Sequence, residues 1–365
     1  MAGKESTNPN QLSSNNLQNQ ANQLWATYRI NEEVKREPIA NERFWNDYLL
    51  LLKGVQKQTY SRIQTTSSHI DNQADDGKKP KTILLRDIVF LVSFVMATSF
   101  LIVYSTLSRT KFYSLESALK NPEQVEELLL SAQYLKAIPR SIARLKNLKK
   151  LDLRSNEIAV VPKEICQLTN LEYLDLAGNQ LTEIPKEIGN LTKLKTLDLA
   201  INELKTIPKD VGKLRMLKVL RLYDNRINKL PKEIGNLTTL RTLGLSFNEI
   251  VKLPKEIWNL QKLTNLDLSF NSIKVVPKGI ENLKLLQTLG LSKIKLSNFP
   301  NEVLKLTKLK RLDLGSNQIT SIPEEIKQLS NLRELSLTFN PNAIMRYESK
   351  LKKWLPLCHV YMYYN

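Results

Sequence analysis

The stretch LDLAGNQLTEIPKEIGNLTKLKT, residues 174–196, contains the pattern that decides the fold of this chain. Leu174 and Leu176 alternate with polar or small residues, as in a short strand with one buried face. Leu181, Ile184 and Ile188 follow at spacings that also direct them inward, and Pro185 begins a segment, PKEIGNL, that is typical of a short helical turn. One such unit cannot bury these side chains alone, so neighbouring copies must cover them.

The unit recurs every 23 residues through the second half of the chain. Nine full copies begin at Leu128, Leu151, Leu174, Leu197, Leu220, Leu243, Leu266, Leu289 and Leu312, and a tenth opens at Leu335. Self-similarity at a fixed period predicts a solenoid over residues 128–340, in the α/β class, with a curved parallel sheet on the concave side and short helical turns on the convex side.

Two further columns support the same register. An Asn closes the strand at positions 156, 179, 202, 225, 248, 271, 317 and 340, where a buried amide can satisfy backbone groups. This column lapses at Gln133 and at Ile294, so we expect local irregularity around residues 293–298. A Pro recurs in every copy from Pro139 to Pro323 and starts the convex turn.

The pattern LxLxxNxLxxIPxxIxxLxxLxx resembles the short-repeat leucine-rich-repeat proteins common in some bacteria. The resemblance extends to SLESALKNPEQVEELLLSAQYL upstream, similar to that family's opening segment, and to ESKLKKWLPLCHVYM downstream, similar to its closing helix and strand. It covers roughly residues 114–365, with an opening segment at 111–127 and a C-terminal cap at 341–365. It implies protein interaction, often at the cell surface, and supplies no single ligand.

The first part of the chain is organised differently. Residues 1–80 form a polar tail whose first 20 residues have too few apolar side chains to fold, with an amphipathic helix at about 41–64. Within residues 81–110, the uncharged run IVFLVSFVMATSFLIVYSTL at 88–107 is long enough for a transmembrane helix of about 30 Å.

The charges beside this run predict its orientation. Four cations precede it (Lys78, Lys79, Lys81 and Arg86) and three follow it (Arg109, Lys111 and Lys120). The positive-inside rule therefore favours, by one charge, a cytoplasmic amino terminus and external repeats.

A partner-binding cluster is predicted on the concave face. Tyr223, Phe247 and Phe270 lie on adjacent rungs, with Ile201 nearby. The surrounding charged residues are Arg221, Asp224 and Asp267. An apolar cluster rimmed by charge is typical of a protein-binding hot spot. The alternative is that the phenylalanines fold inward and cover the ends of the core.

Catalysis has no support in the sequence. The two histidines, His69 and His359, lie in the linker and in the terminal cap, and no metal-ligand, phosphate-loop or cofactor motif is present. The concave aspartates repeat from rung to rung, as expected of a solvated strand face. Cys166 and Cys358 are about eight rungs apart and cannot form a disulfide. We expect no enzyme, metal or cofactor.

The net charge of +18 lies almost entirely in residues 128–365. Much of it is in convex Lys-Glu pairs, which are typical of solvated faces. It allows a weak affinity for anionic lipids or polyanions, and no recognised module points to a specific nucleic acid.

These features predict a membrane-anchored adhesion or scaffold protein whose repeats bind a protein or surface polymer. A single-span signalling regulator, with residues 1–80 binding a cytoplasmic protein partner, is the alternative. A third arrangement, with the repeats in the cytoplasm against the inner membrane surface, follows if the charge argument is wrong.

Overall fold

The computed structural model describes residues 110–362 of the chain. The predicted tail, the helix at 41–64 and the span at 88–107 lie outside these residues. Among the described residues, no helix has both the length and the hydropathy that crossing a membrane requires.

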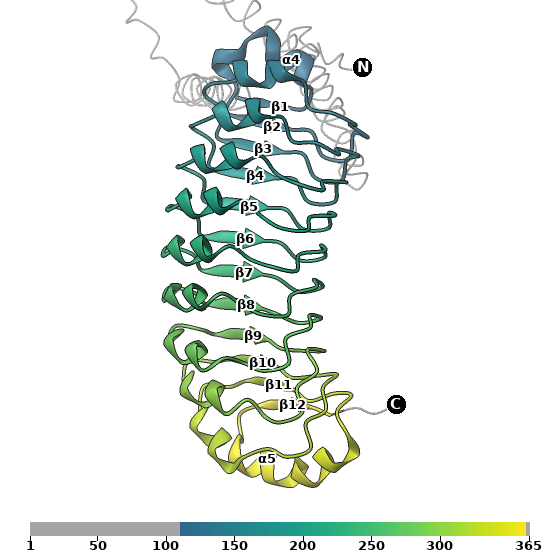
Figure 1. The fold of residues 1–365 in the computed structure, drawn as a ribbon, viewed down its shortest axis with the longest axis vertical. Helices are drawn as coiled ribbons and strands as arrows, with labels where there is room; N and C mark the ends of the chain where they lie inside the picture. The colour runs from purple at the N-terminus through teal and green to yellow at the C-terminus, as the bar shows by residue number, and fades with distance from the viewer. Residues whose placement is uncertain (1–109, 363–365) are drawn as a thin grey trace, which may run out of the picture. The chain divides into compact units, whose positions relative to one another are not determined.

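The predicted solenoid is present, and its sheet runs through the whole described part of the chain (Figure 1). All strands are parallel and follow one another in chain order: β1 (Lys111–Phe112), β2 (Glu127–Leu129), β3 (Lys150–Asp152), β4 (Tyr173–Asp175), β5 (Thr196–Asp198), β6 (Val219–Arg221), β7 (Thr242–Gly244), β8 (Asn265–Asp267), β9 (Thr288–Gly290), β10 (Arg311–Asp313), β11 (Glu334–Ser336) and β12 (His359–Tyr361). Equivalent leucines pair across the rungs, for example Leu174 with Leu197. The sheet is one strand longer at each end than the ten repeat registers, because β1 and β12 pair with the first and last of them.

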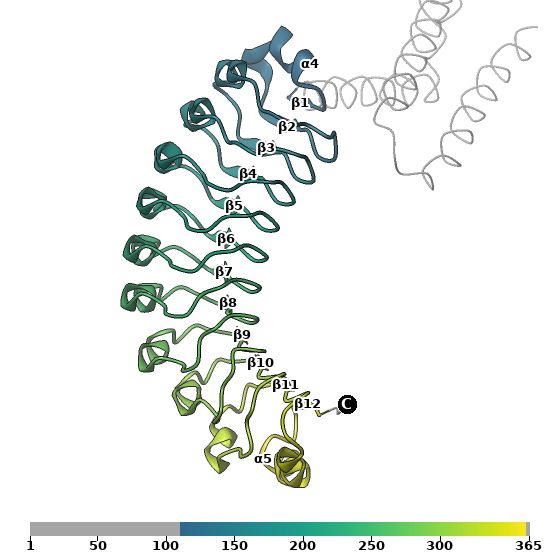
Figure 2. The same cartoon turned by 45° about the vertical axis from the view of Figure 1, so that its right-hand side comes forward.

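The convex segments are 3-10 turns of five residues. They are η2 (Arg140–Arg144), η3 (Lys163–Gln167), η4 (Lys186–Asn190), η5 (Lys209–Lys213), η6 (Lys232–Asn236), η7 (Lys255–Asn259), η8 (Lys278–Asn282), η9 (Asn301–Lys305) and η10 (Glu324–Gln328). In η4 the N–H of Ile188 donates to the Pro185 carbonyl at 3.0 Å, the short-range bond that defines such a turn. Viewed from the side, these turns lie on the outer side of the curve (Figure 2).

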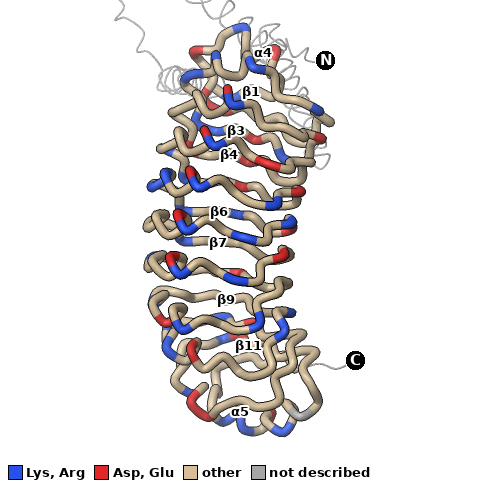
Figure 3. The backbone as a smooth tube through the Cα atoms, viewed as in Figure 1, with Lys and Arg blue, Asp and Glu red and all other residues tan. Residues whose placement is uncertain are grey.

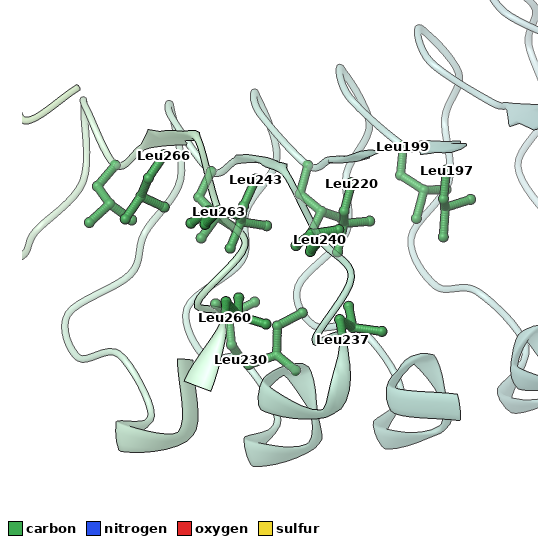
Figure 4. Packing of buried hydrophobic residues seen from close by; sticks show 14 of the residues in the cluster. Leu197, Leu199, Leu220, Leu230, Leu237, Leu240, Leu243, Leu260, Leu263 and Leu266 are labelled. Carbon is green, nitrogen blue, oxygen red and sulfur yellow. The ribbon is translucent and has the colours of Figure 1, made fainter. Parts of the chain in front are cut away.

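Leucine and isoleucine side chains fill the space between sheet and turns. Figure 4 shows Leu220, Leu243 and Leu266 from successive strands stacked above Leu237 and Leu260, which follow the turns. All five are at most 1% exposed. Each buried leucine contributes about 1.5–3 kcal/mol relative to an exposed one, so stacking the rungs drives folding of the array.

Both ends of this core are covered. At the start, α4 (Leu115–Lys120) buries Ala118, and Ser114 caps the helix by accepting the Ser117 N–H at 3.4 Å. A short turn, η1 (Pro122–Gln124), leads into β2. At the other end, η11 (Asn342–Tyr347) and α5 (Glu348–Trp354) bury Leu351 before the chain returns as β12. The helix and strand that the resemblance implied for the C-terminal end are therefore present.

The asparagine column joins neighbouring rungs. Asn179 donates from Nδ2 to the carbonyls of Leu153 and Leu176, both at 3.0 Å, and accepts the Ile158 N–H on Oδ1 at 3.1 Å. The same three contacts recur at Asn202, Asn225, Asn248 and Asn340. Each amide thus replaces backbone partners that a tight turn cannot supply.

The predicted irregularity at residues 293–298 is confirmed. Where Ile294 replaces the asparagine, Asn317 of the next rung accepts both the Ile294 and the Leu296 N–H, at 3.2 and 3.0 Å. A second left-handed residue, Lys295 (φ 66°), follows Lys293 (φ 52°) in this rung. The lapse at Gln133 has the same solution, because Asn156 accepts the Gln133 and Leu135 N–H groups.

Glycine lets neighbouring 3-10 turns in the middle of the array approach each other closely. A Cβ at Gly212 in η5 would lie 2.5 Å from the Glu233 carbonyl oxygen of the next turn. In η7 the equivalent residue is Trp258, which is 7% exposed, and Gly279 of η8 provides the room for its indole. A large side chain in one outer turn, Trp258, is thus matched by a glycine in the next turn, Gly279.

Candidate functional site

The strand aspartates have a structural role that their alternating pattern did not predict. Asp152, Asp175 and Asp198 are 2–6% exposed, so the prediction of a solvated strand face was wrong for them. Each accepts the backbone N–H two residues ahead, at 3.0–3.2 Å. These carboxylates fix the end of the strand.

Neighbouring side chains compensate the buried carboxylates. Arg154 pairs with Asp152 at 2.8 Å, the Tyr173 hydroxyl donates to Asp175 at 2.8 Å, and Arg221 pairs with Asp198 at 3.0 Å. Burial, followed by the hydrogen bond to Asp175, raises the pKa of Tyr173 to about 12. Burial also raises the pKa of Asp198, against the opposing effects of the Ala200 N–H and of Arg221.

The third residue after each strand from β2 to β11 adopts a left-handed backbone. Ile201, Asp224, Phe247 and Phe270 all have φ between 53° and 55°, and Gly178 stands at the same position with φ 65°. Their N–H groups bond to the next rung, as from Phe247 to the Ser269 carbonyl at 3.0 Å. This conformation costs a non-glycine residue roughly 1–2 kcal/mol, and it is unusual for a β-branched side chain such as isoleucine.

Two phenylalanines stack on this column. The ring centroids of Phe247 and Phe270 are 4.0 Å apart, with an interplanar angle of 13°. Phe247 is 51% exposed and Phe270 is half-buried, so Phe247 does not fold inward over the core. The Lys293 ammonium lies 5.2 Å from the Phe270 centroid, within the range of a cation–π contact.

The other predicted residues surround this pair unevenly. Ile201 is 48% exposed and Asp224 is also exposed; they precede Phe247 on successive rungs of the same column. Tyr223 is half-buried. Arg221 is engaged with Asp198, and Asp267 accepts the Ser269 N–H at 3.0 Å, so these two charges also serve the fold.

Part of the surface beside the phenylalanines was not predicted from the sequence. An open groove there includes Glu249, Lys293 and Lys295 in its lining, together with Phe247 and Phe270. Lys293 follows Phe270 in the same repeat column and could have been found from the spacing. Lys295 belongs to the irregular rung, where its left-handed backbone departs from the repeat, so the spacing alone does not place it.

The described residues offer no arrangement typical of catalysis. No group of three or more His, Cys, Asp or Glu side chains within residues 110–362 could hold a metal ion. Burial raises the pKa of the Cys166 thiol to about 12 and that of Cys358 to about 11, which keeps both thiols protonated and weakly nucleophilic at neutral pH.

Comparison with family models identifies the repeats. A model described as "Leucine-rich repeat region" matches residues 163–225, 209–271 and 256–354, which together cover more than half of the chain. A second model, "Leucine rich repeat", matches residues 123–181. No curated protein matches the sequence.

Solved structures share the fold of the array. The leucine-rich-repeat ectodomain of the plant membrane receptor kinase GASSHO1/SCHENGEN3 from Arabidopsis thaliana, in complex with CASPARIAN STRIP INTEGRITY FACTOR 2, is 28% identical with a TM-score of 0.56; the match covers 67% of this chain and 31% of that one. The functional domain of InlJ from Listeria monocytogenes is 27% identical with a TM-score of 0.53, over 61% of this chain and 46% of that one. The plant peptide hormone receptor RGFR1, in complex with RGF2, is 29% identical with a TM-score of 0.50, over 66% and 48%.

This chain therefore spans between about a third and half of the length of these structures. Together with the parallel sheet, the asparagine column and the outer 3-10 turns, the family matches lead to one conclusion: the chain belongs to the leucine-rich-repeat family.

Proposed function

We propose that this protein is a binding scaffold whose repeats hold a protein partner at the aromatic patch, defined as Ile201, Tyr223, Phe247 and Phe270 with Arg221, Asp224 and Asp267 beside them. The observation that carries the proposal is the stacked pair Phe247–Phe270. One ring is half exposed, and both residues occupy left-handed positions that favour glycine or asparagine. Large apolar residues in such positions do not serve stability, which favours a role in binding.

The structural relatives support a protein or peptide as the partner. GASSHO1/SCHENGEN3 and RGFR1 were each solved in complex with a second molecule, an integrity factor and RGF2 respectively. This chain covers less than half of the length of either structure, so we do not assign the partners of those two proteins to it.

We further propose a membrane anchor at residues 88–107, with the amino terminus in the cytoplasm and the repeats outside. The support is the uncharged apolar run and the excess of cations before it. An adhesion or scaffold role follows from this arrangement. The signalling alternative needs a cytoplasmic protein partner for residues 1–80 and stays a prediction from the sequence.

The aromatic patch is tested by replacing Phe247 and Phe270 with Asp in the full chain. The matched control is Phe339→Asp, because Phe339 is also 51% exposed and left-handed (φ 53°) but lies three rungs beyond Phe270. Loss of a central hot spot costs about 2 kcal/mol or more, so partner capture should fall at least about thirtyfold.

The measurement is quantitative mass spectrometry of proteins captured from the envelope fraction of the producing cells. A genuine partner is recovered by the unmodified chain and by Phe339→Asp, and is lost with the double variant. Equal recovery of every captured protein by all three chains would remove the aromatic patch as the binding surface.

A further inference from the structure

A second surface lies along the edge of the array where the chain enters each strand. The residue just before each strand forms a column in which backbone hydrogen bonds join successive members. The Lys218 N–H donates to the Lys195 carbonyl, and the Arg241 N–H donates to the Lys218 carbonyl, both at 2.8 Å. Their side chains therefore leave the same edge at the strand spacing of about 4.8 Å.

The first rungs neutralise this column internally. Glu126, Lys149, Glu172 and Lys195 alternate in sign, with Lys149 paired to Glu126 at 2.8 Å and Lys195 to Glu172 at 2.6 Å. The hydrogen bond to Glu126 raises the pKa of Lys149, and the bond from Lys195 lowers the pKa of Glu172. An acid at this position is thus compatible with the fold and removes the local charge.

The alternation stops at Lys218. Lys218 and Arg241 are adjacent, exposed and of the same sign, and within the described residues neither forms an ion pair. Three more exposed cations lie three or four residues before the strands of the same region: Lys193, Arg215 and Lys262. We call these five residues the basic flank. The segments 192–196, 215–219, 238–242 and 261–265 contain no acidic residue.

The outer turns differ from this edge. There, from η3 to η7, the lysine after the proline is followed by an acid, as in Lys186–Glu187 and Lys232–Glu233, and Figure 3 shows Lys or Arg beside Asp or Glu in successive turns. The positive charge of the turns is therefore offset locally. At Lys218 and Arg241 no ion pair within the described residues offsets the charge, and adjacent like charges repel, so an external anion is the natural counterpart.

We propose that the basic flank binds a linear polyanion, a polymer of phosphate, carboxylate or sulfate groups that runs across the strands. The cations form a line with one or more on every rung from β5 to β8, which matches a chain of regularly spaced anionic groups. Met216 is the exposed large apolar residue within this region. A bilayer-binding face carries several apolar or aromatic anchors, and a protein interface has an apolar centre, so both fit this edge less well.

This surface is separate from the aromatic patch, so the two proposals can fail independently. Within the proposed function, the basic flank would provide a second contact, to an anionic surface polymer. Its interaction depends on charge and is therefore sensitive to salt, whereas binding at the aromatic patch is governed mainly by apolar burial.

The test uses the full chain held in a nonionic amphipol, with long-chain inorganic polyphosphate as the probe. Affinity is measured over a series of salt concentrations for the unmodified chain and for Lys218→Gln/Arg241→Gln. The control, Lys186→Gln/Lys232→Gln, removes the same charge from the outer turns. All four residues are exposed, and circular dichroism verifies that the variants fold.

We expect the flank variant to bind polyphosphate at least about tenfold more weakly, and its slope of log affinity against log salt to be shallower by about two, one for each lost cation. The control should stay within about twofold of the unmodified chain. Polyglutamate and a sulfated polysaccharide, measured in parallel, identify which anionic group is preferred.

Two results would overturn the proposal. Equal weakening of the flank and control variants would mean that net charge alone attracts the polymer. Flank-dependent binding to vesicles of equal parts phosphatidylglycerol and phosphatidylcholine, without binding to any of the polymers, would make this edge a lipid-binding face.

Discussion

Replacing Asn225 with Ala tests whether the asparagine column holds neighbouring rungs together. Asn225 is 8% exposed; Oδ1 accepts the Leu204 N–H at 3.0 Å, and Nδ2 donates to the carbonyls of Leu199 and Leu222 at 2.9 and 3.1 Å. Each of these carbonyls also accepts a second asparagine amide, from Asn202 and Asn248 respectively. The carbonyls therefore keep a partner after the substitution, whereas the buried Leu204 N–H loses its acceptor.

The magnitude follows from this difference. An unsatisfied buried N–H costs about 1–3 kcal/mol, and each lost bond to a carbonyl that keeps another donor costs about 0.5–1 kcal/mol at the low end of the usual range. We expect Asn225→Ala to lower the free energy of unfolding by about 3 kcal/mol. The loss should be largest at the contact between adjacent rungs, because solenoid stability is close to a sum of nearest-neighbour terms.

Two measurements examine this expectation. Urea unfolding of the full chain gives the overall loss, and hydrogen exchange of the Leu204 amide reports opening at the site. The control is Asn190→Ala, at an exposed asparagine in the outer turn η4. A loss below about 1 kcal/mol for Asn225→Ala, or unchanged protection at Leu204, would refute the reasoning from buried backbone donors.

Two further predictions concern the thiols and the orientation of the repeats. Burial raises the pKa of Cys166 from 9.0 to about 12. The stability gained by keeping this thiol neutral is therefore complete below pH 9 and is lost as the pH rises toward 12. Iodoacetamide at pH 8 should leave Cys166 intact in the folded chain and alkylate it in urea. Rapid alkylation of folded Cys166 at pH 8 would contradict the burial argument. Protease added to intact spheroplasts should digest the repeats if they are external, and full protection would place them in the cytoplasm.

The repeat register was predictable because the residues that define it take the same position in every rung. Leu174, Pro185 and Asn179 recur at 23 residues, and the structure places each in the predicted core, turn or column. The irregular rung was predictable as well, since Ile294 cannot make the bonds of an amide. Burial of the strand aspartates was not, because an alternating pattern cannot distinguish a solvated carboxylate from one that caps its own strand end.

The candidate binding surface was predicted in part. Spacing alone brings Phe247 and Phe270 to neighbouring rungs. Their stacking and exposure, however, depend on the left-handed turn, and a phenylalanine in the sequence does not indicate such a turn. The engagement of Arg221 with Asp198 likewise depends on side-chain directions across two strands. The basic flank is visible in the sequence once the register is known, although the absence of ion pairs at Lys218 and Arg241, within residues 110–362, is visible only in the structure.

By itself, the sequence determined that the chain stacks 23-residue rungs into a parallel sheet, because the period specifies which side chains must share a core. Only the tertiary structure decided which polar and aromatic side chains remain available to a partner. The physical reason is that availability depends on neighbours from adjacent rungs. A carboxylate within hydrogen-bonding reach of a backbone N–H is used by the fold, as at Asp175, whereas Lys218 is exposed and forms no ion pair with any residue that the structure describes.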